Sequence, residues 1–376
     1  MSQTVIIKFE LNGLFVKSEG TDMKKLVLLG AGYGNMSILQ GTLKKIPSDV
    51  EITLIDRTPF HSIKTEFYAI AAGTVSDTDV RVPIPEHPQL KFVEGSVDRI
   101  DLDNNRVLLE DGREVEYDEL VIGLGCEDNY HNVPGAAENT YSIQSIYNAR
   151  TTYQDLLGLK GGSTVGIVGA GLSGIELASE LRESRPDLNI KLFDRGPRIL
   201  RDFPERLSNY IQEWFDEHNV EVVAKSNITK VEDGLLHNHD ETIPVDAVVW
   251  TAGVRPVEPV RELEVEKDRG SRVILNEYHQ IPSHPNVYVV GDCASLPHAP
   301  SAQLAGVQGD QIAEVITKTW KGEPLPEKMP ELKLKGFMGA LGKKRGFLHV
   351  GDMTITGRVA RLMKSGLLWY YRWHNS

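Results

Sequence analysis

The 376-residue chain lacks several features that would place it at once in a class of protein. Its two cysteines, Cys126 and Cys293, lie far apart and form no CxxC pair, which disfavours a dithiol–disulfide centre and a structural zinc site. Free thiols fit a reducing cytosol. No run reaches the roughly 18 apolar residues of a membrane-spanning helix. Residues 1–22 lack the basic start and unbroken apolar core of a signal peptide, and we treat them as an extension of unclear origin.

The chain also lacks an excess of positive charge. Its formal net charge of −12 disfavours a general nucleic-acid binder, and we expect no nucleic-acid partner. The charge is uneven, because residues 321–376 hold 11 Lys and Arg against 4 Asp and Glu. A basic tail on an acidic body indicates an anionic surface as the partner of the tail, and a solvated basic face is the alternative.

What the sequence does contain is a dinucleotide-binding unit over residues 164–194. A short β-branched apolar run is followed by GxGxxG at Gly169, Gly171 and Gly174, a helix, a second strand and Asp194. The first glycine allows a tight turn, the second lets a pyrophosphate approach the backbone, and the third lets helix and strand pack closely. The helix N-terminus offers free N–H groups to the phosphates, and Asp194 can accept hydrogen bonds from a ribose diol.

Residues 24–56 repeat the unit, with Gly30, Gly32 and Gly34 after the first strand and Asp56 at the end of the second. The third motif position is Asn35, so we expect the helix to stand slightly further from its strand here. Two such units predict two nucleotides, most simply a flavin and a nicotinamide.

Other short segments complete the pattern of candidate ligand contacts. His61 and Lys64 precede a predicted helix over residues 66–72 and serve either as flavin contacts or as parts of a solvated turn. Gly125 closes a Gly-Leu-Gly segment after a predicted strand. Asp292 follows Gly291 after another strand, where it can accept from a ribityl hydroxyl or cap a turn.

Several short motifs follow one another along the chain: GAGYG, GLG, GAGLSGIE, TAGV, VYVVGDCA and SAQLA. In this order they resemble the motifs of the flavoprotein reductases with two dinucleotide domains, the pyridine nucleotide-disulfide oxidoreductase superfamily. The ending LGKKRGF with a short amphipathic tail looks most like the type II, non-proton-pumping NADH dehydrogenases, specifically the short proteins of Gram-positive bacteria. The resemblance covers residues 23–375. It implies an α/β fold with two Rossmann-like domains: a discontinuous FAD domain (23–133 and 253–320), an inserted NAD(P)H domain (134–252) and a C-terminal amphipathic segment (321–376).

The resemblance also implies roles for individual residues. Non-covalent FAD would be contacted by Gly30, Gly32, Gly34, Asp56, Val97, Gly125, Gly291 and Asp292. NADH would be contacted by Gly169, Gly171, Gly174, Asp194 and Gly253. The catalytic candidates are Glu176 near the nicotinamide, Lys64 near the flavin and Gln303 at the acceptor. The quinone-site motif AQxAxQ begins at Ala302 and Gln303, but Val307 replaces its second Gln, and Gln308 follows.

The implied function is a hydride transfer from NADH to FAD, followed by electron transfer to a menaquinone-like quinone without proton pumping. Because the cofactor carries the chemistry, no side-chain nucleophile is required. Asp194 would repel a 2′-phosphate and favour NADH, but Arg195 could grip that phosphate, so NADPH stays open as donor. Val307 leaves the acceptor less defined than the donor.

The C-terminal segment over residues 357–374 combines basic residues with Trp and Tyr. On a helix, Val359, Leu362, Met363, Tyr370 and Trp373 fall near one face, and Arg358, Arg361 and Lys364 fall elsewhere. Such a helix suits an anionic headgroup layer, which predicts a cytoplasmic protein peripheral to the inner face of the cell membrane. The alternative is a helix packed on the body or on a second subunit, and a homodimer stays open.

Two other functions remain alternatives at this point. The first is another enzyme of the superfamily, either a sulfide:quinone reductase, which would use Cys126 and Cys293 at the flavin, or an NAD(P)H reductase for a soluble electron carrier. The second is a non-catalytic flavoprotein that binds NADH and signals redox state to a partner.

Overall fold

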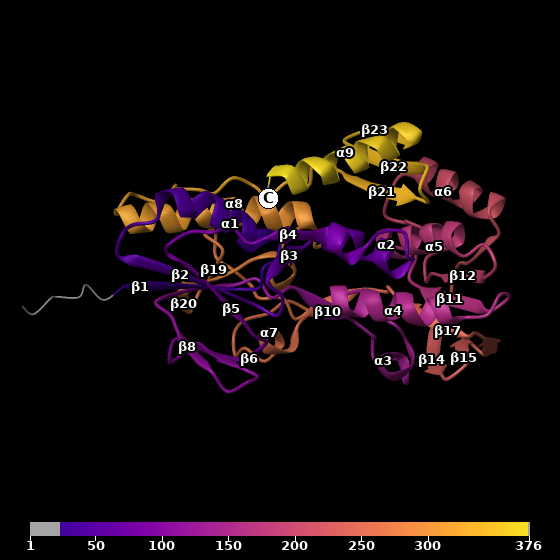
Figure 1. The fold of residues 1–376 in the computed structure, drawn as a ribbon, viewed down its shortest axis with the longest axis horizontal. Helices are drawn as coiled ribbons and strands as arrows, with labels where there is room; N and C mark the ends of the chain where they lie inside the picture. Colours follow the sequence, from indigo (N-terminus) through magenta and orange to yellow (C-terminus); the bar gives the residue numbers. More distant parts are fainter. Residues whose placement is uncertain (1–22, 375–376) are drawn as a thin grey trace, which may run out of the picture.

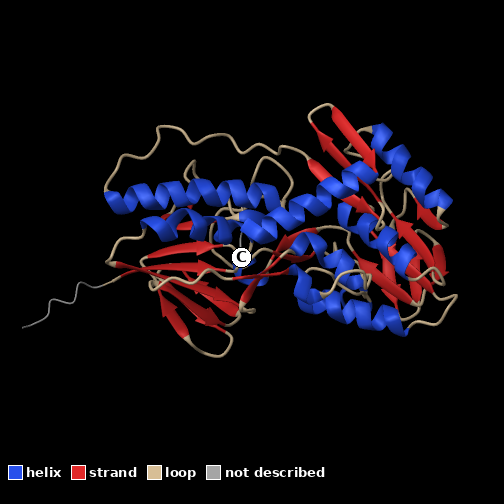
Figure 2. Cartoon of the chain, turned by 45° about the horizontal axis from the view of Figure 1, so that its top comes forward, coloured by secondary structure: helices blue, strands red, loops and turns tan. Residues whose placement is uncertain are grey.

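The computed structural model describes residues 23–374, which form two mainly parallel sheets side by side, with a long C-terminal helix that runs from the second towards the first (Figure 1). Figure 2 shows that helices and strands alternate through both halves, as an α/β chain requires. The expected α/β class with two Rossmann-like units is confirmed. The extension expected at residues 1–22 lies outside the described residues.

The first sheet is built around β1 (Lys24–Leu29), and its strands follow the order β19-β20-β9-β1-β2-β5. Every neighbouring pair is parallel except β19–β20 at one edge. Residues 26–29 are all buried, because both faces of the parallel sheet are covered. The other strands are β2 (Val50–Asp56), β5 (Leu90–Glu94), β9 (Glu119–Ile122), β19 (Gln280–Ile281) and β20 (His284–Val289).

Helices cover one face of this sheet and a small antiparallel sheet covers the other. Leu26 and Leu28 pack against α1 (Tyr33–Thr42) and α8 (Ala302–Lys321), whereas Val27 and Leu29 pack against β6, β7 and β8. The two helices approach closely, since a Cβ on Gly309 would lie 2.3 Å from the backbone oxygen of Gly34. The small sheet comprises β6 (Val97–Asp101), β7 (Arg106–Leu109) and β8 (Glu114–Glu116).

The second sheet has four parallel strands in the order β13-β12-β11-β17. The helices α5 (Leu172–Ser184) and α6 (Glu205–Glu217) pack into its core, and the antiparallel sheet β14-β15-β16 contributes to a separate apolar cluster. The strands are β11 (Thr164–Val168), β12 (Asn189–Phe193), β13 (Val220–Val223), β14 (Ile228–Glu232), β15 (Leu235–Asn238), β16 (Glu241–Pro244) and β17 (Ala247–Trp250).

The chain passes between the two sheets twice, through the antiparallel pair β10 (Cys126–Asp128) and β18 (Val254–Pro256). The helices α2 (Phe67–Ala71) and α4 (Ile146–Gly158) contact each other near this crossing, and α2 also contacts α5. Shorter elements are β3 (Phe60–Ser62), β4 (Arg81–Pro83), α3 (Ala136–Asn139), α7 (Glu258–Arg261) and the 3₁₀ turns at Leu43–Lys45, Lys64–Glu66, Asp77–Val80 and Gly291–Cys293.

The C-terminal part contains more structure than the expected amphipathic segment. Three antiparallel strands, β21 (Phe337–Leu341), β22 (Arg345–Val350) and β23 (Met353–Gly357), precede α9 (Arg358–His374). Figure 1 shows α9 running from these strands towards α8. Lys364 does not belong to a solvated basic face, because it is 5% exposed and points into the body. Within residues 23–374, every helix is too short or too polar to cross a bilayer.

Candidate functional site

The first glycine loop, residues 30–32, joins β1 to α1. Gly30 adopts φ +89°, and a Cβ there would lie 2.5 Å from the oxygen of Gly123, so only glycine fits. Asp56, at the end of β2, accepts from the N–H of Ala31 at 2.6 Å and from the N–H of Thr58 at 2.8 Å. The carboxylate therefore sits against the loop, where the sequence predicted a ribose contact.

The second glycine loop, residues 169–171, has the same construction between β11 and α5. Gly169 adopts φ +108°, and Asp194 accepts from the N–H of Ala170 at 2.9 Å and from the N–H of Gly196 at 2.6 Å. A Cβ on Gly174 would lie 1.9 Å from the oxygen of Gly169, so this glycine lets α5 pack against its own loop.

Both loops fit a dinucleotide pyrophosphate. Whereas α4 and α8 begin with the serine caps Ser145 and Ser301, α1 and α5 begin at Gly32 and Gly171 with no side-chain cap. Uncapped N–H groups at a helix N-terminus attract anions. A Cβ on Gly171 would meet nothing within 4 Å, which leaves room for a ligand at the backbone.

Asn35 has a role at the end of β1 that the sequence did not predict. Asn35 is 1% exposed, and its Nδ2 donates to the oxygens of Leu29 and Gly30 at 2.8 and 2.7 Å. The room for this side chain comes from Gly123 on the neighbouring strand, where a Cβ would lie 2.7 Å from Nδ2. Gly34, a predicted cofactor contact, instead faces Val290, whose side chain would lie 2.3 Å from an added Cβ.

Lys64, Cys126 and Asp292 form a chain of hydrogen bonds beside the first loop. Lys64 Nζ donates to Cys126 Sγ at 3.0 Å, and the thiol donates to Asp292 Oδ2 at 2.9 Å. Burial raises the pKa of Cys126 to about 12, so it remains a thiol. Burial opposes the charge of Lys64, but the neighbouring Cys126 and Asp292 raise its pKa overall. The structure thus brings two predicted site residues together through a cysteine.

Among the other predicted FAD contacts, Gly125 and Gly291 are chain neighbours of Cys126 and Asp292, whereas Val97 lies in a different element. Gly125 adopts φ +76° just before β10, and a Cβ there would meet nothing within 4 Å. The N–H of Gly291 is already taken by Gln308 Oε1 at 2.8 Å. Gln308 is fully buried, and its Nε2 donates to the oxygen of Val289 at 3.0 Å. Val97 opens β6 and packs in the core of the first sheet.

Glu176 lies in a buried cluster with Glu66, Tyr68 and Lys364, which we call the lysine cluster. Lys364 Nζ lies 2.6 Å from Glu176 Oε1, 3.0 Å from Glu66 Oε1 and 2.6 Å from the Tyr68 hydroxyl. Burial raises the pKa of Glu176 to about 7 even though Lys364 opposes the shift. The carboxyl can therefore exchange a proton near neutral pH. The sequence offered no signal for this partner, 188 positions away.

A pocket of about 450 Å³ opens where α1, α8 and the end of α9 meet, and we call it the α8–α9 pocket. It brings together the predicted acceptor residues Ala302 and Gln303 with Val307. Gln303 Oε1 accepts from the N–H of Lys335 at 2.8 Å, which fixes one wall. The remaining lining residues are Tyr33, Ser37, Gln40, Gly306, Asp310, Lys335, Tyr370, Tyr371 and His374.

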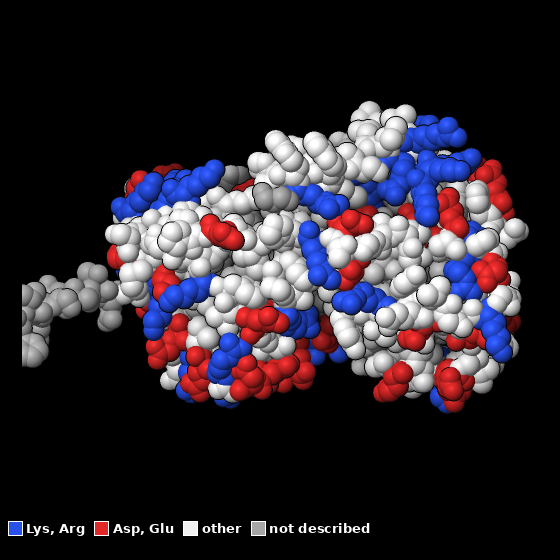
Figure 3. Space-filling model, viewed as in Figure 1, with Lys and Arg blue, Asp and Glu red and all other residues white. Residues whose placement is uncertain are grey.

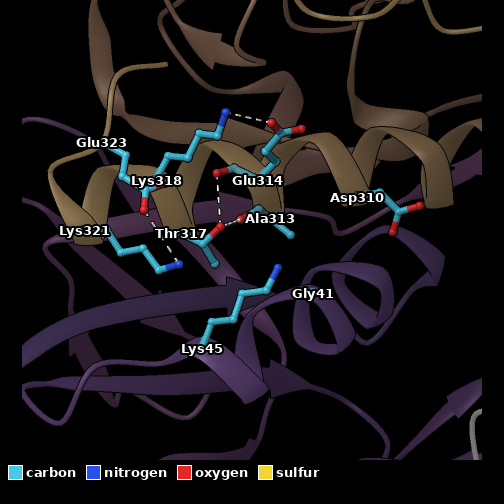
Figure 4. Close-up of a pocket in the computed structure, with 9 residues that line it drawn as sticks. All are labelled: Gly41, Lys45, Asp310, Ala313, Glu314, Thr317, Lys318, Lys321 and Glu323. Carbon is cyan, nitrogen blue, oxygen red and sulfur yellow. Dashed lines mark hydrogen bonds and ion pairs between the residues drawn. The ribbon is translucent and has the colours of Figure 1, made fainter. Parts of the chain in front are cut away.

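A second hollow of about 430 Å³ lies further along α1 and α8 (Figure 4). Four of its charged side chains form two pairs: Lys318 lies 3.0 Å from Glu314, and Lys321 lies 3.9 Å from Glu323. Apart from its shared edge at Asp310, it contains none of the residues that line the α8–α9 pocket, and none of the predicted site residues lines it.

The outer face of α9 is rich in exposed apolar and aromatic side chains. Leu362 is 71% exposed, Trp369 66% and Trp373 65%. Figure 3 shows Lys and Arg gathered near the start of this helix, where Lys343, Lys344, Arg345 and Arg358 are exposed. An apolar and aromatic face bordered by basic residues matches the chemistry of an anionic headgroup layer.

A family model matches the part of the chain that contains both glycine loops. The model described as pyridine nucleotide-disulphide oxidoreductase matches residues 24–309, and the chain belongs to this family. It is therefore an enzyme, and its family confirms the expected FAD and NADH cofactors.

Individual relatives narrow the comparison. The chain is 59% identical to the NADH dehydrogenase-like protein YutJ of Bacillus subtilis over 354 residues, which cover 94% of this chain and 100% of the relative. It is 27% identical to a type II NADH:quinone oxidoreductase of Staphylococcus aureus over 380 residues, 91% of this chain and 94% of that protein. Its fold is similar to that of NDH2 from Plasmodium falciparum solved in complex with NADH, with a TM-score of 0.82, 14% identity, and coverage of 93% and 96%.

Proposed function

We propose that this enzyme passes electrons from NADH through FAD to a quinone at the inner face of a cell membrane, without pumping protons. The observation that carries the proposal is the α8–α9 pocket, which adjoins both the first glycine loop, through Tyr33, and the exposed aromatic end of α9, through Tyr370. A quinone ring carried in from a membrane could reach such a pocket. The S. aureus relative, named as a quinone oxidoreductase, supports the same acceptor.

We assign FAD to the first glycine loop, in a domain of residues 23–133 and 253–320, and NADH to the second, in residues 134–252. Bound FAD accepts a hydride and releases electrons, which is the chemistry that the cofactor supplies. Asp56 and Asp194 would orient the riboses, and the two uncapped helices would hold the phosphates. Gly253, with φ +120° at the end of the second sheet, would let NADH pass close to the backbone.

The remaining candidate residues would position the ligands or hold a proton. Lys64 would hold Asp292 in place through Cys126, so that the Asp292 carboxylate stays oriented towards the ribityl chain of FAD. Gln303 would position the quinone. Glu176 would hold a proton that it can release near neutral pH, since burial brings its pKa to about 7. The raised pKa values of Cys126 and Cys293 disfavour thiolate chemistry, which weakens the sulfide-oxidising alternative.

Anaerobic stopped-flow absorbance tests the two half-reactions separately. NADH should bleach the bound flavin, and a menaquinone analogue should then restore its colour. Filling the pocket with Gly306→Leu should slow the recolouring by about tenfold or more while bleaching is unchanged. Glu314→Leu, in the second hollow, is the matched control. Equal recolouring in the Gly306→Leu variant would redirect the search to a soluble carrier or a redox-sensing role.

Vesicle binding tests the membrane assignment. The double variant Trp369→Ser/Trp373→Ser should lose most of its binding to vesicles containing anionic lipid, because both rings are largely exposed on α9. Tyr147→Ser/Leu157→Ser removes comparable exposed apolar surface from α4 and should leave vesicle binding intact. Equal binding by both variants would count against α9 as the membrane surface. NADH oxidation in sealed vesicles with a trapped pH dye should produce no internal acidification.

A further inference from the structure

His61 connects the first glycine loop to α9. The histidine is fully buried on β3, so the alternative of a solvated turn at this position is wrong. Its Nδ1 lies 2.7 Å from the oxygen of Ala31, and its Nε2 lies 3.0 Å from the hydroxyl of Tyr371. The two ring nitrogens thus contact segments that lie far apart in the sequence.

The chemistry of the two contacts fixes their direction. A carbonyl oxygen only accepts, so Nδ1 carries the proton and donates to Ala31. Burial lowers the pKa of His61 and favours the neutral ring. Nε2 of the neutral ring is then an acceptor, and the Tyr371 hydroxyl donates to it. Tyr371 of α9 therefore donates to His61, and His61 donates to Ala31 of the first glycine loop.

Ala31 is the central residue of a loop whose glycines have no side chains to anchor it. Its N–H donates to Asp56 at 2.6 Å, and its oxygen accepts from His61, so both polar groups of this residue are held. Tyr33, the first residue of α1, packs edge-on against the same imidazole at 4.8 Å between ring centroids. The orientation of the N–H groups after Gly32 thus depends on the position of His61.

The second glycine loop holds the same carbonyl in another way. The oxygen of Ala170 is approached by the backbone N–H of Leu200 at 3.4 Å, from the connection between β12 and α6. Only the first of these two loops is tied to α9 by the contacts described. Among the described contacts, a side-chain donor to the carbonyl of the middle loop residue is therefore specific to the loop that we assign to FAD.

The position of Tyr371 is set by the rest of α9. Lys364 anchors the middle of the helix in the lysine cluster, and Arg361 lies 3.6 Å from Glu180 of α5. Tyr371 follows two helical turns after Lys364 and reaches inward, while Trp369 and Trp373 stay exposed. The helix that presents an apolar outer surface thus holds the loop with its inner surface.

We propose that Tyr371 is a positioning residue for the first glycine loop, acting through His61, and that the docking of α9 thereby strengthens FAD binding. The proposal rests on the assignment of FAD to this loop. It gives α9 a second role beside the membrane contact: a substitution that disturbs its inner face weakens flavin retention at a site in another part of the chain.

The test is the FAD dissociation constant of Tyr371→Phe, measured by flavin fluorescence during reconstitution of the apoprotein. This variant keeps the ring and removes the donor, so FAD should bind about five- to tenfold more weakly, as expected for one lost buried hydrogen bond. NADH binding should change less than twofold. Tyr147→Phe, on α4 and 72% exposed, is the control and should bind FAD normally.

A spectroscopic measurement separates positioning from a general loss of structure. In protein labelled with ¹⁵N-histidine, Tyr371→Phe should shift the Nε2 resonance of His61, while Nδ1 stays protonated. FAD affinity within twofold of the wild type would overturn the proposal, and so would an equal loss of FAD and NADH affinity. Gly32→Val distinguishes the underlying assignment: if this variant binds FAD normally, the first loop is not the FAD site and both claims fail. If Gly32→Val abolishes binding while Tyr371→Phe does not weaken it, only the role of Tyr371 fails.

Discussion

In each dinucleotide unit, a polar side chain donates to two carbonyl oxygens where the first strand ends, and a glycine opposite leaves room for it. The polar residue comes from the helix in the first unit and from the strand side in the second. In the first unit the helix supplies Asn35, whose amide donates to the oxygens of Leu29 and Gly30, and the neighbouring strand supplies Gly123. In the second unit the strand supplies Thr251, whose hydroxyl donates to the oxygens of Val168 and Gly169 at 3.0 and 2.8 Å. The helix there supplies Gly174.

The strand pairing shows that these positions correspond. Leu29 pairs with Ile122 in the first sheet as Val168 pairs with Trp250 in the second, so Gly123 and Thr251 follow equivalent residues. Each unit therefore has one polar side chain that satisfies two carbonyls at the end of the strand, and one glycine opposite that leaves room for it. The third position of the motif requires glycine only when the polar group comes from the strand.

The largest effect is expected from adding a side chain at Gly174, the glycine of the second unit. In Gly174→Ala the new Cβ would lie 1.9 Å from the oxygen of Gly169 and 2.8 Å from Thr251 Oγ1. We expect a loss of about 3 kcal/mol or more in the free energy of unfolding, because backbone has to move. Denaturant unfolding measures this, and Ser173→Ala, exposed and adjacent, is the control. A loss below about 1 kcal/mol would contradict the packing argument.

A second difference between the units lies two positions further along each helix, where Ser37 in α1 corresponds to Glu176 in α5. Burial raises the pKa of Glu176 from 4.5 to about 7. A raised carboxyl pKa gives stability that is fully present below pH 4.5 and is lost as the pH rises through 7. Between pH 5 and 8 the wild type should therefore lose up to about 3 kcal/mol through this group.

Glu176→Gln should flatten that dependence of the free energy of unfolding on pH, because the amide does not titrate. The Gln oxygen can still accept from Lys364 and from the N–H of Ala340, which both contact Oε1 in the wild type. Unfolding by urea at four pH values between 5 and 8 measures the effect. Ser173→Ala, exposed on the same helix, should leave the slope unchanged. Parallel pH profiles for wild type and Glu176→Gln would show that Glu176 does not titrate in this range.

The two units also show how far the sequence alone could go. The glycine loops and the acids Asp56 and Asp194 were predictable, because their geometry is set within one strand–loop–helix segment. The contacts of Asn35 were not predictable, because its room is created by Gly123, which follows another strand. The burial of Lys364 was not predictable, because helical periodicity separates the two faces of α9 but does not reveal the carboxylates of Glu66 and Glu176 that lie under one of them. The strands β21–β23 carry several glycines, which hide the alternation of a sheet.

The correspondence between the two units can be tested by giving the first unit the residues of the second, a glycine at position 35 and a threonine at position 123. Asn35→Gly removes the donor to the oxygens of Leu29 and Gly30 and should cost about 2 kcal/mol, with weaker FAD binding. Adding Gly123→Thr should recover part of this loss, since the new hydroxyl copies Thr251. The recovery stays partial because a Cβ at position 123 would also lie 3.0 Å from Val290 Cγ1.

Gly123→Thr without Asn35→Gly is the matched control for the transplant. It should be destabilising, because a Cβ at position 123 would lie 2.7 Å from Asn35 Nδ2. The double-mutant cycle of unfolding free energies therefore predicts a favourable coupling between the two substitutions. Additive costs would show that residues 35 and 123 do not substitute for positions 174 and 251.

The smallest expected effect is that of Thr251→Val, which keeps the shape of the side chain and removes only the hydroxyl. The oxygens of Val168 and Gly169 lose a donor, which should cost about 1 kcal/mol of stability and weaken NADH binding by about fivefold. FAD binding should be unchanged, because the first unit has its own donor in Asn35. Titration of the oxidised enzyme with NAD⁺, followed by tryptophan fluorescence, measures the affinity, with Thr229→Val in the exposed strand β14 as control. Weaker FAD binding in Thr251→Val would mean that the two units depend on each other, and the comparison between them would then no longer separate one nucleotide site from the other.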